Sequence, residues 1–270
     1  MTQEIFQVDA FSDKPFGGNP AAVCILSEDR GDQWMQLVAN EMNLSETAFL
    51  RKRADGGYDL RWFTPQIEVD LCGHATLASA HVLWQEKLLA LDETARFYTR
   101  SGLLTAQHQQ DLIELNFPVK PETRVDDESL VRALVDALRA AGQVNYVGRN
   151  SFDFLVELSS EREVRALEPD FGRLKRLDVR GVIVTARADA SSDYDFVSRF
   201  FAPGSGIDED PVTGSAHCCL AKFWSERLGK NEFRAIQVSK RGGQLFVRLE
   251  GNRVRLGGRA VTTLRGRLFC

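Results

Sequence analysis

Two stretches of the chain carry nearly the same pattern, and this repeat limits the possible folds more than any other feature. Residues 68–84 read "EVDLCGHATLASAHVLW", and residues 208–224 read "DEDPVTGSAHCCLAKFW". Each has polar and turn-forming residues, then a glycine, then a run of small and apolar residues. Placing Gly73 on Gly214 aligns the two runs.

The alignment extends well beyond these two stretches. Upstream, "RWFTP" at 61–65 falls on "RFFAP" at 199–203. Downstream, Gly102 follows Gly73 by 29 residues, and Gly243 follows Gly214 by 29 residues. Further upstream, "GNPAAVCIL" resembles "RNSFDFLVEL". Ordered matches at similar offsets indicate an internal duplication of about 130 residues, and hence two domains of the same fold.

The segment after each glycine is predicted to be a buried helix. Its apolar residues cover all sides of a helix, which is typical of a helix enclosed by other elements. In the second copy, Gly229 is a stop signal. A more amphipathic helix is expected before "LSETAF", with "SLVRALVDALRAAG" at 129–142 as its counterpart in the second half.

Runs typical of β-strands surround these helices in both halves. Examples are "AAVCIL", "ETAFLRK" and "YDLRWF" in the first half, and "FDFLVEL", "GVIVTA" and "YDFVSRFF" in the second. We therefore predict an α+β fold of two pseudo-symmetric domains, each a β-barrel-like sheet wrapped around a central helix. The expected domains are 1–116 and 117–261, with 262–270 returning to the first and "NFPVKPETR" at 116–124 as the linker.

Composition excludes several classes of function. The 270 residues carry a net charge of −4 without a basic patch, so no nucleic-acid partner is expected. No apolar run has the length of a membrane helix, and the N-terminal residues do not resemble a signal peptide. Five cysteines without a spaced framework indicate reduced thiols in a cytoplasmic protein: Cys24, Cys72, Cys218, Cys219 and Cys270.

Both repeated stretches place a glycine at the start of a buried helix. Such a start exposes N–H groups and a partial positive charge, and glycine lets a ligand approach the backbone. Two like domains facing one cleft would direct two helix starts into it, which suits a carboxylate. A small-molecule carboxylate is therefore the expected substrate. The alternative is that Gly73 and Gly214 only permit close packing.

The motifs "GGNPAAV", "LSETAF", "LCGHATLASA" and "DEDPVTGSA" occur in this order along the chain. Together they resemble the phenazine-biosynthesis isomerase-like (PhzF-like) family, over essentially the whole sequence. That resemblance implies the diaminopimelate-epimerase-like fold and a cofactor-independent isomerase with its active site between the domains. It also implies a homodimer, and it leaves the substrate open.

The resemblance also assigns roles to residues of these motifs. Glu46 corresponds to the catalytic acid/base, and His74 and Asp210 correspond to supporting catalytic residues. The substrate-binding residues that it implies are Gly73, Gly214, Ser215, Ser45 and Asn19. Without the resemblance, each residue could have a simpler role. Glu46 could be a solvated glutamate at a strand end, His74 could cap a helix, and Asp210 could form a turn. The second half offers no glutamate at the corresponding place, where it reads "RGVIVTA".

The sequence leaves three other interpretations: an epimerase or racemase, a metal site and an anion-binding protein. A two-thiol amino-acid epimerase or racemase of the same fold needs a cysteine before Gly73 and another before Gly214. Cys72 precedes Gly73, but the residue before Gly214 is Thr213. A metal site could draw on two sets of soft ligands, Cys72 with His74 and the run His217, Cys218 and Cys219. The spacing disfavours it, because Cys218 and Cys219 point about 100° apart on a helix and no C-x2-C pair exists. A non-catalytic protein that binds small anions remains the third alternative.

Overall fold

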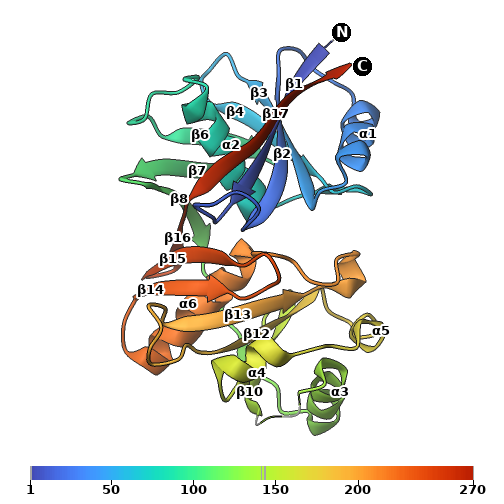
Figure 1. The fold of residues 1–270 in the computed structure, drawn as a ribbon, viewed down its shortest axis with the longest axis vertical. Coiled ribbons are helices and arrows are strands. Elements are labelled where there is room, and N and C mark those ends of the chain that lie inside the picture. Colours follow the sequence, from blue (N-terminus) through green and yellow to red (C-terminus); the bar gives the residue numbers. More distant parts are fainter. Residues whose placement is uncertain (1, 141, 143, 270) are drawn as a thin grey trace. The chain divides into compact units, whose positions relative to one another are not determined.

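The computed structural model describes residues 2–140, 142 and 144–269. Two compact units make up the chain (Figure 1). Unit 1 extends to Phe117 and resumes at Arg255, and unit 2 comprises Pro118–Val254. The chain thus returns to unit 1 at Arg255, earlier than the expected 262, because β16 (Arg253–Gly258) already pairs with β8 of unit 1.

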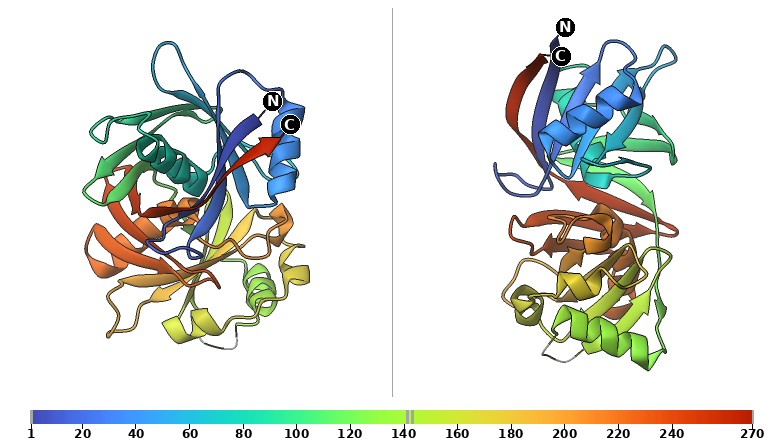
Figure 2. Two further views of the ribbon diagram at one scale, coloured as in Figure 1. Left: turned by 45° about the horizontal axis from the view of Figure 1, so that its top comes forward. Right: turned by 90° about the vertical axis from the view of Figure 1, so that its right-hand side faces the viewer.

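Unit 1 is a mixed sheet with one buried and one outer helix. Its strands are β1 (Thr2–Ala10), β2 (Asn19–Leu26), β3 (Glu46–Lys52), β4 (Tyr58–Phe63), β5 (Glu68–Val69), β6 (Ala95–Thr99), β7 (Gly102–Gln109), β8 (Leu112–Pro118) and β17 (Ala260–Phe269). Its helices are α1 (Asp32–Met42) and α2 (Gly73–Gln85). β17 pairs antiparallel with β1 along its length, so the two ends of the chain lie side by side (Figure 2).

The buried helix α2 occupies the centre of unit 1. Ten of its thirteen residues are buried, and it contacts β1, β2, β3, β7 and β17. Helix α1 packs instead on the outer face of β3 and β4, where Met35 and Val38 lie against Phe49 and Phe63. The predicted central helix and the predicted amphipathic helix are both confirmed.

Unit 2 repeats the strand order of unit 1. Its strands are β9 (Thr123–Arg124), β10 (Val144–Arg149), β11 (Asp153–Leu158), β12 (Gly181–Arg187), β13 (Phe196–Phe201), β14 (Glu232–Gln237) and β15 (Gly243–Glu250). Its helices are α3 (Glu128–Leu138), α4 (Glu161–Ala166), α5 (Phe171–Leu174) and α6 (Gly214–Leu228), with a 3₁₀ turn η1 at Pro203–Ser205. Gly229 ends α6 in the left-handed conformation, as predicted.

Strand pairing shows the duplication directly. In unit 1, β2–β3 is parallel, β3–β4 antiparallel, β4–β6 parallel and β6–β7 antiparallel. In unit 2, β11–β12, β12–β13, β13–β14 and β14–β15 follow the same sequence of directions. An ion pair is repeated as well: Arg61 binds Glu68 through two hydrogen bonds, and Arg199 binds Glu209 in the same way.

One predicted correspondence is wrong. Helix α3 is not the counterpart of α1, because α1 connects β2 to β3 whereas α3 precedes β10. The segment equivalent to α1 lies between β11 and β12 and contains the short helices α4 and α5. Amphipathic periodicity identified α3 as a surface helix, but position in the strand order decides which elements are equivalent.

Candidate active site

Glu46 and His74 meet at the start of α2 in unit 1. Glu46 is the first residue of β3, and His74 is the second residue of α2. Nε2 of His74 lies 3.1 Å from Oε2 of Glu46. Both atoms are buried, and neither makes a well-directed hydrogen bond within the described chain. The contact is therefore an ion pair by distance, and the carboxylate keeps its capacity to accept a proton.

The Glu46 side chain is largely removed from water, with 14% of it exposed. The imidazole of His74 is buried more deeply. Burial lowers the pKa of His74, but the charge of the Glu46 carboxylate and the contacts of the ring with Cys72 and Glu46 act in the opposite direction, and the net shift is upward. The direction of this shift favours a protonated ring beside Glu46.

Asn19 and Cys72 complete this cluster from two other segments. The side-chain amide of Asn19 lies 3.2 Å from Nδ1 of His74, and Sγ of Cys72 lies 3.5 Å from the same atom. Gly18, with φ of 62°, precedes Asn19, and a Cβ there would meet the carbonyl oxygen of Ala10 at 2.1 Å. Only glycine fits this turn, which explains the "GGN" spelling of the motif.

The Cys72 thiol is protonated in this environment. Burial raises its pKa to about 11, and the charge of Glu46 acts in the same direction. One ligand atom each from Glu46, Cys72 and His74 lie within 4.8 Å of one another, a set that zinc accepts. Glu46 is 26 residues before Cys72 in the chain, so sequence spacing does not reveal it as a third ligand; the fold brings it beside Cys72 and His74.

A second cluster forms at the start of α6 in unit 2, where Asp210, Gly214 and Ser215 lie. Thr213 donates its hydroxyl to Oδ2 of Asp210 at 2.5 Å, so it does not cap the helix. Gln237 supports both residues, since it donates to the Asp210 carbonyl oxygen at 2.7 Å and accepts from the Thr213 N–H at 2.9 Å. Asp210 thus fixes the turn that leads into α6.

Ser215 accepts a hydrogen bond from Arg180 at 3.1 Å. Arg180 also binds the buried carboxylate of Asp153. Neither Arg180 nor Asp153 was selected from the sequence, because 27 residues separate them and each alone resembles an ordinary strand-end charge.

The structure therefore places the sequence-predicted residues in two groups, one in each unit. Unit 1 brings Asn19, Glu46 and His74 together, with Gly73 beside them at the start of α2 and Ser45 directly before Glu46. Unit 2 holds Asp210, Gly214 and Ser215. The four cysteines within the described residues are buried and form no disulfide with one another; Cys270 lies outside these residues.

The two groups differ most at one equivalent position. Glu46 begins β3 opposite Ala21, and Gly181 begins β12 opposite Asp153. A Cβ at Gly181 would meet the ring of Phe200 at 2.3 Å. Since the Phe200 ring fills this space, unit 2 has no room for a carboxylate like that of Glu46.

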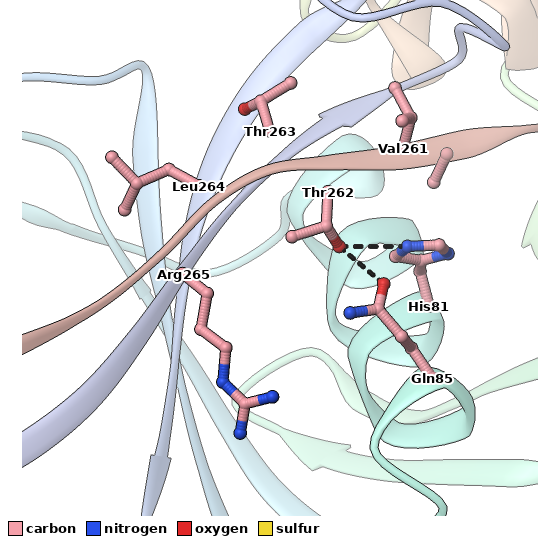
Figure 3. A pocket seen from close by; sticks show the side chains of 8 residues that line it. His81, Gln85, Val261, Thr262, Thr263, Leu264 and Arg265 are labelled. Atoms are coloured by element: carbon pink, nitrogen blue, oxygen red, sulfur yellow. Dashed lines mark hydrogen bonds between the residues drawn. The ribbon is translucent and has the colours of Figure 1, made fainter.

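An open hollow of unit 1 lies away from this chemistry, between α2 and β17 (Figure 3). Thr262 donates to Oε1 of Gln85 at 2.7 Å, and its hydroxyl lies 3.1 Å from Nε2 of His81. None of the predicted site residues lines this hollow. No helix in the described part of the chain is both long and apolar enough to cross a membrane.

Comparison with known proteins agrees with this architecture. The model of the phenazine biosynthesis-like protein family matches residues 8–266. An uncharacterised isomerase of Halalkalibacterium halodurans is 54% identical over 100% of this chain and 99% of its own length. A crystal structure of a PhzF-family phenazine biosynthesis protein from Enterococcus faecalis has a TM-score of 0.91 at 40% identity, over 100% of both chains.

A hydroxyproline epimerase from Agrobacterium vitis shares the fold at a greater distance. Its TM-score is 0.64 at 14% identity, covering 99% of this chain and 92% of that one. The predicted epimerase-like fold of two pseudo-symmetric domains is thereby confirmed, as is the predicted resemblance to the PhzF-like family.

Proposed function

The chain belongs to the phenazine biosynthesis-like protein family, and on this basis we propose that it is an isomerase that needs no cofactor. Its reaction moves a proton between two carbon atoms of a small substrate that bears a carboxylate. Glu46 is the single acid/base. The observation that carries the proposal is the largely buried Glu46 carboxylate, held 3.1 Å from the buried His74 imidazole.

The reaction follows from the chemistry of this pair. The Glu46 carboxylate takes a proton from a carbon next to a double bond that is conjugated with the substrate carboxylate, and the electron pair of the broken C–H bond delocalises into the conjugated system. The protonated Glu46 then returns the proton to another carbon on the same face. Glu46 takes the proton and gives it back as a general acid/base, and because 14% of its side chain remains exposed, its proton exchanges with solvent between the two steps.

His74 has two roles in this proposal. Its Nε2 holds the carboxylate oxygen of Glu46 in place, and in its protonated form the ring stabilises the anion that forms on the substrate. Asn19 fixes the ring from the opposite side, since its amide faces Nδ1. Asp210 is a positioning residue, because its bond to Thr213 fixes the start of α6.

A single base distinguishes this reaction from racemisation. Inverting a carbon centre in the two-thiol manner requires acids or bases on both faces of the substrate. Here Thr213 stands at the position equivalent to Cys72, its hydroxyl is engaged by Asp210, and the space equivalent to the Glu46 side chain is filled by Phe200. Transfer of a proton on one face is what one carboxylate supports.

The test is Glu46→Gln, which keeps the shape of the side chain and removes its proton affinity. Wild-type protein in deuterated water is first incubated with a panel of dicarboxylates and cyclic diene carboxylates, and deuterium incorporation at carbon is followed by NMR. We expect Glu46→Gln to lower exchange of the responsive substrate by at least about 100-fold. Glu41→Gln, an exposed position on α1, is the matched control and should retain exchange.

Two results would contradict the proposal. Near-full exchange in a folded Glu46→Gln protein would remove Glu46 from the mechanism. Tight binding of a carboxylate with no exchange in the wild type would favour the non-catalytic anion-binding alternative.

A further inference from the structure

Unit 2 contains an arginine, Arg180, whose side chain is fixed by hydrogen bonds although part of its guanidinium group has no partner among the described residues. Nε of Arg180 donates to Oδ1 of Asp153 at 2.9 Å, and Nη2 donates to Oδ2 at 2.5 Å. Nη2 also donates to Oγ of Ser215 at 3.1 Å. Nη1 has no hydrogen-bond or ion-pair partner among the residues that the structure describes. Two N–H donors of a rigid guanidinium thus remain available.

The way in which Arg180 is held is unusual for a surface residue. The side chain of Asp153 is 1% exposed, whereas that of Arg180 is 39% exposed. Burial raises the pKa of Asp153, and the two contacts with Arg180 act against that rise. A buried carboxylate destabilises the folded state unless it is paired with a cation. The Asp153 carboxylate is paired with Arg180, and its two hydrogen bonds fix the plane of the guanidinium group. A solvated arginine would need no such support.

Two aromatic rings lie near the guanidinium group of Arg180, and a second cation lies near one of these rings. The guanidinium carbon of Arg180 lies 5.3 Å from the ring centre of Phe152 and 5.6 Å from that of Phe200. Nζ of Lys120 lies 5.2 Å from the same Phe152 ring. Phe200 is buried, but Phe152 is 45% exposed. Two cations therefore flank one exposed aromatic ring.

We propose that Arg180, Lys120 and Phe152 form a binding site for a carboxylate carried by a flat, unsaturated carbon skeleton. The carboxylate bonds to Nη1 of Arg180 and to the ammonium group of Lys120, and the flat skeleton stacks on Phe152. The site requires no turnover, so it stands or fails independently of the role proposed for Glu46.

Chemical features of the ligand can be separated with three simple probes. Benzoate is flat and charged, cyclohexanecarboxylate is charged but not flat, and benzamide is flat but neutral. Binding of each to the full chain is measured by isothermal titration calorimetry and by ligand-observed NMR. Benzoate should bind at millimolar concentration or better, and each of the other two at least about tenfold more weakly, since each lacks one of the two contacts.

The variants remove one group at a time without leaving a buried charge alone. Arg180→Gln by itself would strand the Asp153 carboxylate and could unfold unit 2. The double variant Arg180→Gln/Asp153→Asn removes both charges and should weaken benzoate binding by at least about tenfold. Phe152→Leu should abolish the preference for benzoate over cyclohexanecarboxylate while keeping the preference for benzoate over benzamide.

Arg234 provides the matched control. It is an exposed arginine of the same unit, and its guanidinium carbon lies 5.8 Å from the Tyr194 ring and 5.9 Å from the Phe246 ring. Arg234→Gln should leave benzoate binding unchanged. Three results would overturn the proposal: no binding of benzoate to the wild type, equal binding of benzoate and benzamide, or unchanged binding in the folded double variant.

Discussion

His217 allows a direct test of the interior of unit 2. It lies in the second turn of α6, is fully buried, and stacks on Phe196 with ring centres 6.0 Å apart. Its Nδ1 donates to the carbonyl oxygen of Thr213 at 2.8 Å, so the neutral ring carries its proton there. Burial lowers the pKa of His217 from 6.5 to about 4, and the Thr213 bond offsets only part of that effect.

The sign of the pH dependence follows from this shift. Because the pKa of folded His217 lies below its unfolded value, the unfolded chain binds more protons between pH 6.5 and about 4. The contribution of His217 to stability is therefore complete above pH 6.5 and is lost as the pH falls. Proton linkage with these two pKa values gives a loss of about 2 kcal/mol between pH 7 and pH 5.

The perturbation is His217→Gln, which keeps an amide donor but cannot titrate. Urea unfolding of both proteins is measured at pH 7 and pH 5. The variant should be less stable at pH 7, because packing on Phe196 is lost. Between pH 7 and pH 5, however, it should lose about 2 kcal/mol less unfolding free energy than the wild type. A histidine NMR titration provides a direct readout, in which the ring signal of His217 stays in its neutral position down to pH 5.

An equal loss between pH 7 and pH 5 in the wild type and the variant would refute this reasoning. So would an NMR midpoint for His217 near 6.5. His74 gives the opposite sign: its folded pKa is raised, so its contribution is complete below the unfolded value and is lost only as the pH rises through the raised value. A loss on the acid side therefore cannot come from His74.

Three further predictions concern Cys72 of the candidate site and the position equivalent to Glu46 in unit 2. Cys72→Ala should cost on the order of 1 kcal/mol of stability and leave hydrogen exchange within a few-fold of the wild type, because the thiol is buried and protonated; loss of exchange would instead make Cys72 a second acid/base. Iodoacetamide at neutral pH should leave Cys72 unmodified in the native protein, as measured by peptide mass spectrometry. Gly181→Ala should destabilise the protein by about 1–3 kcal/mol in urea unfolding, since the new methyl group meets the Phe200 ring, and Gly181→Ala/Phe200→Leu should recover part of that loss; no destabilisation would mean that Phe200 moves freely.

Much of the fold is predictable from the sequence because both halves of the chain carry the same pattern of residues. Apolar residues around all sides of two segments predict buried helices, and α2 and α6 are buried. Alternating and β-branched runs predict strands, and β3, β4 and β12 begin where those runs begin. Strands β6 and β10 were not predicted from the sequence. The equivalence of α1 and α3 was also wrong, because periodicity does not reveal between which strands a helix connects.

Sequence and tertiary structure contributed differently to the candidate site. Glu46, His74 and Asn19 belong to motifs that identify the family, so the sequence by itself selected them. Their contacts with one another and with Cys72 arise because α2 starts beside the first residues of β2 and β3. That placement is a property of the packed unit and has no local signal.

The pairing of Arg180 with Asp153 was decided by tertiary structure alone. Asp153 lies opposite Gly181 because β11 and β12 pair in parallel, and this register brings Arg180, the residue before Gly181, to the buried carboxylate. The antiparallel pairing of β12 with β13 in turn leaves the Phe200 ring in the space that a side chain at Gly181 would need. The sequence determined that the two halves share one fold and that only the first has a glutamate at this position. The groups that occupy that position in the second half depend on pairing between strands that are distant in the chain. Register and side-chain volume, and not sequence order, decide which residues are neighbours there.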